Sequence, residues 1–164
     1  MGRLAPILMT LLLLLVARAG LALEPGFSIE MQAALPVDQK AALSVARQFL
    51  AAVSDRDLDG AMARVAVPFI WDREQIAETS NALRQGFVVL FEEEIKEKIV
   101  VTADEIYPAG SAILGTFSTE AQKFAGEKLG KGGLVYFAFV QDERIALLLK
   151  KTPDGHWLVV GFED

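Results

Sequence analysis

The sequence contains no cysteine and only one histidine among its 164 residues. Without cysteine the chain can form neither a disulfide nor a zinc site built on thiolates, and a single histidine excludes a multi-histidine metal site. No loop carries the alternating acidic residues of a calcium site. We therefore expect no metal and no cofactor, and a fold that depends on its hydrophobic core.

Long apolar runs are absent except at the start of the chain. Residues 7–16 are apolar apart from Thr10, Arg3 precedes them, and small residues follow. This order is typical of a secretory signal peptide, and the run is shorter than the roughly 20 residues of a membrane span. We expect cleavage after Ala22, with cleavage after Ala19 as the rival. An uncleaved anchor is the remaining alternative.

Basic residues are also scarce, at 16 against 22 acidic residues. Removal of a signal peptide over residues 1–22 leaves 14 basic and 22 acidic residues, a net charge of −8. Such a surface disfavours nucleic acids and anionic membranes, which bind through Lys and Arg contacts to phosphate. We expect an exported protein, periplasmic or secreted, with no nucleic-acid partner and no stable membrane anchor after cleavage.

The remaining chain is predicted to have an extended leader over residues 23–35 and a single domain over residues 36–164, since it shows no repeat or linker. Apolar residues at helical spacing predict a first helix: Ala42, Val45, Ala46, Phe49, Leu50 and Val53. Asp57 is expected to cap a short second helix that ends at Pro68. Asp72, with Gln75 in the capping-box position, predicts the start of a third helix.

From residue 96 onwards the apolar period changes from 3.6 to 2, which predicts strands. We expect them over residues 96–108, 111–117, 134–140, 145–151 and 156–162, with a small helix and a glycine-rich loop over 118–133. The strand over 134–140 is apolar on both faces, which is typical of a strand covered on both sides. Helices followed by strands predict an α+β fold, with three helices packed on a curved, mainly antiparallel sheet.

Four features follow one another along the chain: the pair Phe49-Leu50, the helix-opening Asp57, the pair Pro68-Phe69 and the segment Gly155–Val160. Together they resemble the nuclear transport factor 2-like superfamily, whose cystatin-like domains are cones of three helices wrapped by a curved sheet. The resemblance covers about Pro36 to Asp164, and residues 110–133 form a longer connection than is usual there. It implies an internal pocket but no single activity, because members include isomerases, dehydratases, binding proteins and contact modules.

The lone histidine, His156, follows the turn Pro153-Asp154-Gly155. This turn predicts a three-residue hairpin loop with Thr152 opposite His156, followed by the pairs Lys151/Trp157, Lys150/Leu158 and Leu149/Val159. A residue at the mouth of such a hairpin is open to water. We therefore interpret His156 as a solvent-exposed turn residue and not as a catalytic group.

Acidic residues offer two further candidates for catalysis. Asp72 is better explained as a helix cap, because a helix N-terminus favours its charged form and opposes the raised pKa of a general base. Glu105 and Tyr107 share one face of their strand, and the resemblance implies that isomerases of this superfamily use such an acid and tyrosine. A solvated strand end explains the pair better, so we assign no catalytic residue.

Apolar and aromatic residues are plentiful, whereas convergent ionisable groups are few. We therefore favour a domain that binds a small apolar ligand, with Trp71, Tyr107 and Tyr136 lining its pocket, and leave open whether it is an enzyme. One alternative is a small hydro-lyase or isomerase with an acid and tyrosine in the cone. The other is a structural module that forms a homodimer through the sheet face, which would suit the doubly apolar strand.

The predicted signal peptide leads to a direct test. N-terminal sequencing of the exported protein is expected to give Leu23 as the first residue, because cleavage should follow Ala22. A start at Gly20 would support the rival site after Ala19. A start at Met1 in exported material would rule cleavage out.

Overall fold

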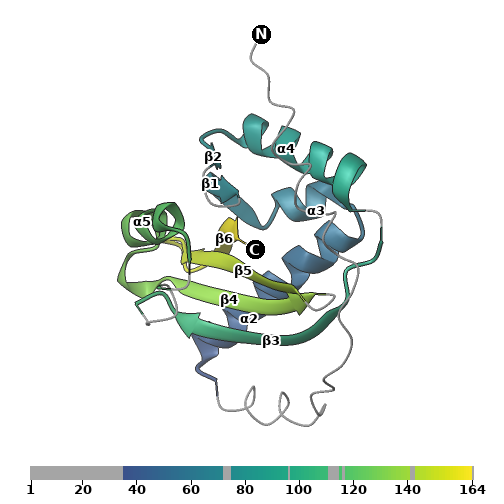
Figure 1. The fold of residues 1–164 in the computed structure, drawn as a ribbon. Coiled ribbons are helices and arrows are strands. Elements are labelled where there is room, and N and C mark those ends of the chain that lie inside the picture. The colour runs from purple at the N-terminus through teal and green to yellow at the C-terminus, as the bar shows by residue number, and fades with distance from the viewer. Residues whose placement is uncertain are drawn as a thin grey trace.

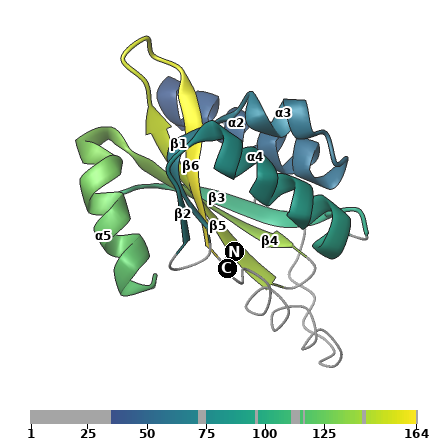
Figure 2. The same cartoon turned by 90° about the horizontal axis from the view of Figure 1, so that it is seen from above.

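The strands form one sheet, and helices cover both of its faces (Figures 1 and 2). The computed structural model describes residues 35–71, 75–95, 97–110, 115, 117–140 and 143–163. Helices α2, α3 and α4 lie on one face of the sheet, and helix α5 lies on the other, as the view from above shows. None of the helices in these ranges has the length and apolarity needed to span a membrane.

Helix α2 (Val37–Ser54) carries the predicted apolar stripe and packs it against the sheet. It ends where Arg56 takes a positive φ of 55°, which breaks the helical path. The short helix α3 (Leu58–Met62) follows, and the Gly60 N–H donates to Oδ1 of Asp57 at 2.9 Å. The prediction that Asp57 caps this helix is therefore confirmed.

Helix α4 (Ser80–Val89) begins later than the sequence indicated. The N-cap is Thr79, whose Oγ1 accepts a hydrogen bond from the Ala82 N–H at 3.2 Å. The prediction of a helix from Asp72 is wrong, because residues 75–77 pair as a strand; Asp72 itself lies outside the described residues. A π-helical turn, η3 (Leu90–Glu94), continues α4 toward the first long strand of the sheet.

Within the described residues the sheet has six strands, in the order β2-β1-β6-β5-β4-β3. The parallel pair is β1–β6, and the other neighbours are antiparallel. The strands are β1 (Val65–Trp71), β2 (Gln75–Ala77), β3 (Val101–Pro108), β4 (Leu134–Val140), β5 (Glu143–Lys151) and β6 (Trp157–Glu163). The sequence pattern missed β1 and β2, because the short apolar run around Pro68 reads as the end of a helix. The strand predicted over 111–117 falls mostly outside the described residues.

The central strands are buried on both faces. On the α2 face, Tyr136, Leu147 and Val159 join a core with the apolar residues of α2 and α4. On the other face, Val135 and Phe137 join a second core with α5 (Thr119–Lys128), which contributes Ala121, Phe124 and Ala125. Helix α5 therefore explains why β4 is apolar on both faces, and it lies within the long connection noted in the sequence.

Aromatic residues dominate the core between α4 and β1. The Phe87 ring is fully buried, and its centroid lies 4.8 Å from that of Trp71, 5.9 Å from Phe49 and 6.2 Å from Phe69. Edge-to-face contacts of this kind add to the free energy gained by burying the rings. They fix α4 against the end of the sheet that carries β1.

Replacement of Phe87 by Ala is expected to lower the free energy of unfolding by about 3–5 kcal/mol, because it leaves a cavity among these rings. Val89→Ala is the matched control on the same helix, since Val89 is 40% exposed, and should change stability by about 0.5 kcal/mol or less. Urea unfolding followed by tryptophan fluorescence measures both. Equal losses for the two variants would contradict the assignment of this core.

Candidate functional site

A groove of about 540 Å³ lies between the C-terminal half of α2 and strand β3. Its lining from α2 and the following turn is Arg47, Leu50, Ala51, Ser54 and Asp55, and from the opposite wall Lys98, Ile99, Val101, Thr102, Ala103 and Asp104. The volume falls within the range of typical small-molecule sites. The groove therefore has the size of a binding site for a small organic molecule.

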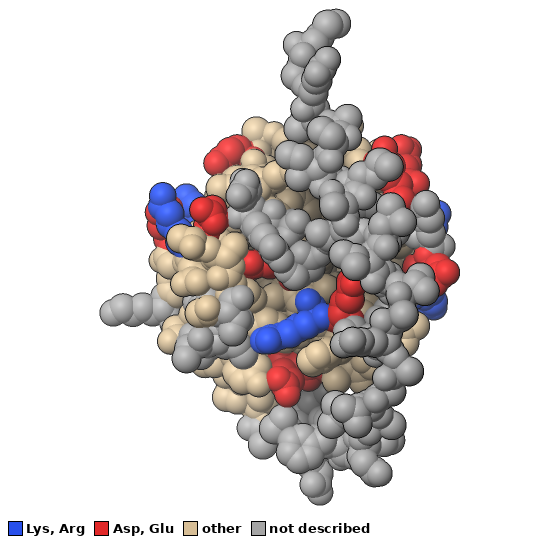
Figure 3. Space-filling model, viewed as in Figure 1, with Lys and Arg blue, Asp and Glu red and all other residues tan. Residues whose placement is uncertain are grey.

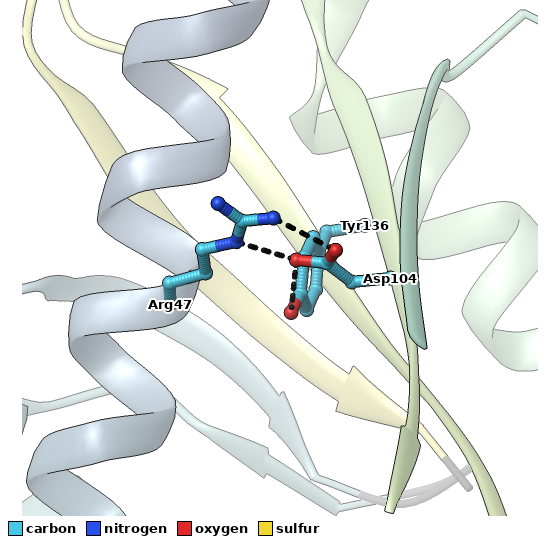
Figure 4. Close-up of polar contacts among 3 residues, drawn as sticks. All are labelled: Arg47, Asp104 and Tyr136. Atoms are coloured by element: carbon cyan, nitrogen blue, oxygen red, sulfur yellow. Dashed lines mark hydrogen bonds and ion pairs between the residues drawn. The ribbon is translucent and has the colours of Figure 1, made fainter. Parts of the chain in front are cut away.

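Two residues of the groove lining, Arg47 and Asp104, form an ion pair (Figure 4). The Nε and Nη2 atoms of Arg47 donate to Oδ2 and Oδ1 of Asp104 at 2.6 and 2.8 Å, and the Tyr136 hydroxyl donates to Oδ2 at 3.1 Å. The Asp104 side chain is 7% exposed, whereas that of Arg47 is 43% exposed. Two hydrogen bonds between the same side chains fix both the distance and the relative orientation of Arg47 and Asp104. The ion pair therefore holds α2 and the edge strand β3 together.

Burial and the neighbouring charges shift the ionisation of this cluster. The hydrogen bond from Arg47 to Asp104 raises the pKa of the Arg47 guanidinium. Burial of the ring, and then the negative charge of Asp104, raise the pKa of Tyr136 well above its ordinary value near 10. Tyr136 is therefore a hydrogen-bond donor at any physiological pH.

A second hydrogen bond also joins the two walls of the groove. The Ile99 N–H donates to Oγ of Ser54 at 2.9 Å. This bond holds the segment before β3 against the last turn of α2. The contacts of Arg47 with Asp104 and of Ser54 with Ile99 thus hold the two walls of the groove together.

Glu105 and Tyr107 lie on the face of the sheet that α5 covers. The Tyr107 hydroxyl donates to Oε2 of Glu105 at 2.6 Å, which raises the pKa of Tyr107, and the Tyr107 ring packs at 6.1 Å from that of Phe137. Glu105 is exposed to solvent. The two residues do contact each other, but the sheet separates them from the groove.

The three aromatic residues expected to line one pocket lie in three different surroundings. Trp71 packs against Phe69 and Phe87, at the β1 end of the core. Tyr136 is buried in the core of the α2 face and reaches Asp104, and Tyr107 lies on the α5 face. None of the three is among the residues that line the groove.

His156 lies in the exposed turn between β5 and β6, as predicted. The Thr152 N–H donates to the His156 carbonyl at 2.7 Å, and Gly155 takes a φ of +87° in the loop. The pairs Lys151/Trp157, Lys150/Leu158 and Leu149/Val159 match the expected register. The histidine is therefore part of the hairpin geometry and lies away from the groove residues.

The sequence did not point to Arg47. Its position on α2 reads as a solvated side chain beside the apolar stripe, and its partner lies 57 residues later in the chain. Asp104 carried a weak signal, because strand alternation places it on the face opposite to Glu105. The sequence did not show which face of β3 meets the helices, because that depends on the pairing of β3 with β4.

The described residues contain no cluster of three or more His, Cys, Asp or Glu side chains that could hold a metal ion. On the face of the molecule shown in Figure 3, acidic and basic side chains lie next to one another in its described part and do not gather by sign. The groove follows this pattern, since its lining has two acidic and two basic residues. Its polar groups are therefore suited to hydrogen bonding more than to attracting an ion.

Solved structures resemble this chain in fold. A protein with a cystatin-like fold from Nostoc punctiforme shares 12% identity, with a TM-score of 0.52 over 79% of this chain and 90% of its own. A candidate ketosteroid isomerase from Shewanella frigidimarina shares 14% identity, with a TM-score of 0.52 over 77% and 96%. An NTF2-like protein from Pseudomonas putida shares 13% identity over 74% and 80%, with a TM-score of 0.49.

The fold is the cystatin-like cone. This confirms the α+β class and the cystatin-like cone expected from the sequence. No protein-family model matches the chain, and no curated protein sequence matches it. Identities this low show the fold alone, so the activity has to be argued from the groove itself.

The surroundings of Tyr136 predict its titration. The chain has two tyrosines, so Tyr107→Phe leaves Tyr136 as the only one, and its ultraviolet absorbance should show no tyrosinate at pH 10–11 while the protein stays folded. Because its folded pKa is raised, Tyr136 stabilises the fold fully below about pH 10, and this contribution is lost as pH rises further. Tyr136→Phe should therefore weaken the fall of unfolding free energy above pH 10. A normal titration near pH 10 in the folded state would contradict the buried contact with Asp104.

Proposed function

We propose that this chain is an exported domain that binds a small organic molecule in the groove between α2 and β3. The observation that carries the proposal is the groove itself, whose volume of about 540 Å³ suits such a molecule. Its lining combines five apolar residues with six polar ones, and hydrogen bonds hold Arg47, Asp104 and Ser54 in place. Export rests on the signal-peptide pattern of residues 1–22.

The state of Asp104 favours binding over catalysis. A general base needs a lone pair directed at the substrate proton, and its protonated form must be accessible. Both oxygens of Asp104 accept hydrogen bonds from Arg47, and Oδ2 accepts another from Tyr136. Transfer of a proton to Asp104 would disrupt this network, so the carboxylate is better suited to holding the groove together.

An isomerase or hydro-lyase is the alternative, and the contact between Asp104 and Tyr136 is the observation that favours it. An acid and a tyrosine lie 3.1 Å apart beside the groove, on the face that the sequence-based alternative required. The similar fold of the candidate ketosteroid isomerase is consistent with this alternative without adding to it. The ion pair with Arg47 favours binding over catalysis, because the positive charge of Arg47 compensates the negative charge of Asp104.

A homodimer through the sheet face stays a prediction. Helix α5 covers the part of that face formed by Val135, Phe137 and Leu148. A second copy would have to use the part that α5 leaves open, where Phe139 is 42% exposed. The binding proposal does not depend on this contact.

Filling the groove tests the proposal. A fragment collection screened by ligand-observed NMR is expected to give hits that shift the backbone amides of groove residues. Ala51→Trp should abolish these hits, because Ala51 is an exposed α2 residue lining the groove, and an indole would occupy the space. Ala41→Trp is the matched control, since Ala41 is exposed on the same helix and does not line the groove.

Three results would count against the binding proposal. They are an absence of hits, hits whose shifts map outside the groove, and hits that bind Ala51→Trp as well as the unmodified chain. Equal melting temperatures for the two tryptophan variants would show that any loss of binding comes from the filled groove and not from unfolding.

A further inference from the structure

The sheet has one long open edge. Among the described residues, β3 has a single neighbour in the sheet, β4, so the other side of β3 is unpaired there. Strand β3 has eight residues, whereas β2, at the opposite edge of the sheet, has three. An edge strand of this length presents a row of N–H and C=O groups, which is the surface that an added strand needs.

The register of β3 shows which backbone groups point to this open edge. The Ala109 N–H donates to the Gly133 carbonyl at 2.9 Å, and the one-to-one pairing of β3 with β4 continues from there back to Ala103. In an antiparallel pair, residues that bond to the neighbouring strand alternate with residues whose N–H and C=O point away from it. The backbone groups of Asp104 and Ile106 therefore point toward the open edge.

The residues that precede α2 carry the pattern of such a strand. Apolar and polar residues alternate over the segment 27–32, which consists of Phe27, Ser28, Ile29, Glu30, Met31 and Gln32. This alternation predicts a strand with one covered face, and the segment lies outside the described residues. Strand β3 has matching faces, because Ile106 packs against the core on the α2 side and Glu105, on the other side, is exposed.

The chain is long enough to bring this segment to β3. Helix α2 starts beside the end of β5, where Nζ of Lys151 donates to Oδ2 of Asp38 at 2.8 Å. Strand β4 begins at this end of the sheet and β3 finishes there. A strand added beyond β3 would lie three strand spacings from β5, or about 14 Å. The chain over residues 31–37 reaches about 20 Å when extended.

A second copy of the chain fits this edge less well. Antiparallel pairing about the middle of two β3 strands would place either the two Asp104 residues or the two Glu105 residues opposite each other, and like charges there are destabilising. The segment 27–32 brings one acidic residue, Glu30. It is also tethered to the domain, which raises its effective concentration at the edge. The tethered segment is therefore the favoured occupant.

We infer that residues 27–32 pair with the open edge of β3 and add a strand to the sheet. Phe27, Ile29 and Met31 then lie on the α2 side, and the polar residues of the segment lie on the exposed side with Glu105. The inference does not rest on the proposed binding function, since it concerns the backbone of β3 and not a ligand in the groove.

Hydrogen exchange of single amides, measured by NMR, tests the added strand. In the full mature chain, residues 23–164, the amides of Asp104 and Ile106 are expected to exchange slowly, because the segment accepts their hydrogen bonds. Ile29→Pro should raise both exchange rates by about tenfold or more, because proline disrupts a strand and a released amide exchanges freely. Glu24→Pro is the matched control, since residue 24 lies outside the segment, and it should leave both rates unchanged.

The amides of Glu105 and Tyr107 point to β4 and report whether β3 itself stays folded. Their exchange rates should be the same in all three chains. Fast exchange of Asp104 and Ile106 in the unmodified chain would overturn the inference, as would slow exchange that Ile29→Pro does not change, or an equal rise at all four amides. Slow exchange that is lost on dilution, with a dimer mass in light scattering, would assign the edge to a second copy instead.

Discussion

The structure depends on the burial of its central strands from both sides. β4, β5 and β6 carry apolar side chains on each face, covered on one side by α2 and α4 and on the other by α5. Loss of either cover would expose large apolar residues to water, so both layers are needed to keep the sheet in place. Helix α2 packs on one side of this doubly covered sheet, and its position there determines the groove between α2 and β3.

The edge strand β3 is held differently from the centre. It has one neighbour in the sheet, β4, and its inward-facing Asp104 meets Arg47 and Tyr136. The ion pair replaces part of the apolar packing that a central strand would have, and it leaves an opening beside α2. An inward-facing charge on an edge strand also discourages pairing with other chains. One interaction thus holds the edge strand against α2 and forms part of the groove lining.

Local signals predicted the elements that depend on neighbours in the chain. The strand over residues 134–140, the hairpin register around His156 and the cap at Asp57 are all correct, because alternation, turn residues and caps act over a few residues. Strand β1 was missed for the opposite reason, because its partner β6 is distant in the chain: Val65 pairs with Val159. Strand β2 is a different case, since it pairs with the nearby β1, and that pairing overrides the local pattern that favours a helix after Asp72.

For the candidate site, the sequence by itself determined which residues share a face. Alternation separates Asp104 from Glu105 and joins Glu105 to Tyr107, and the structure agrees. Only the tertiary structure decided which of the two faces meets α2. That choice depends on the register between β3 and β4 and on α5 covering the other side, and both are contacts between distant segments. Arg47 became part of the site for the same reason, since its partner is brought to it by the sheet and not by the chain.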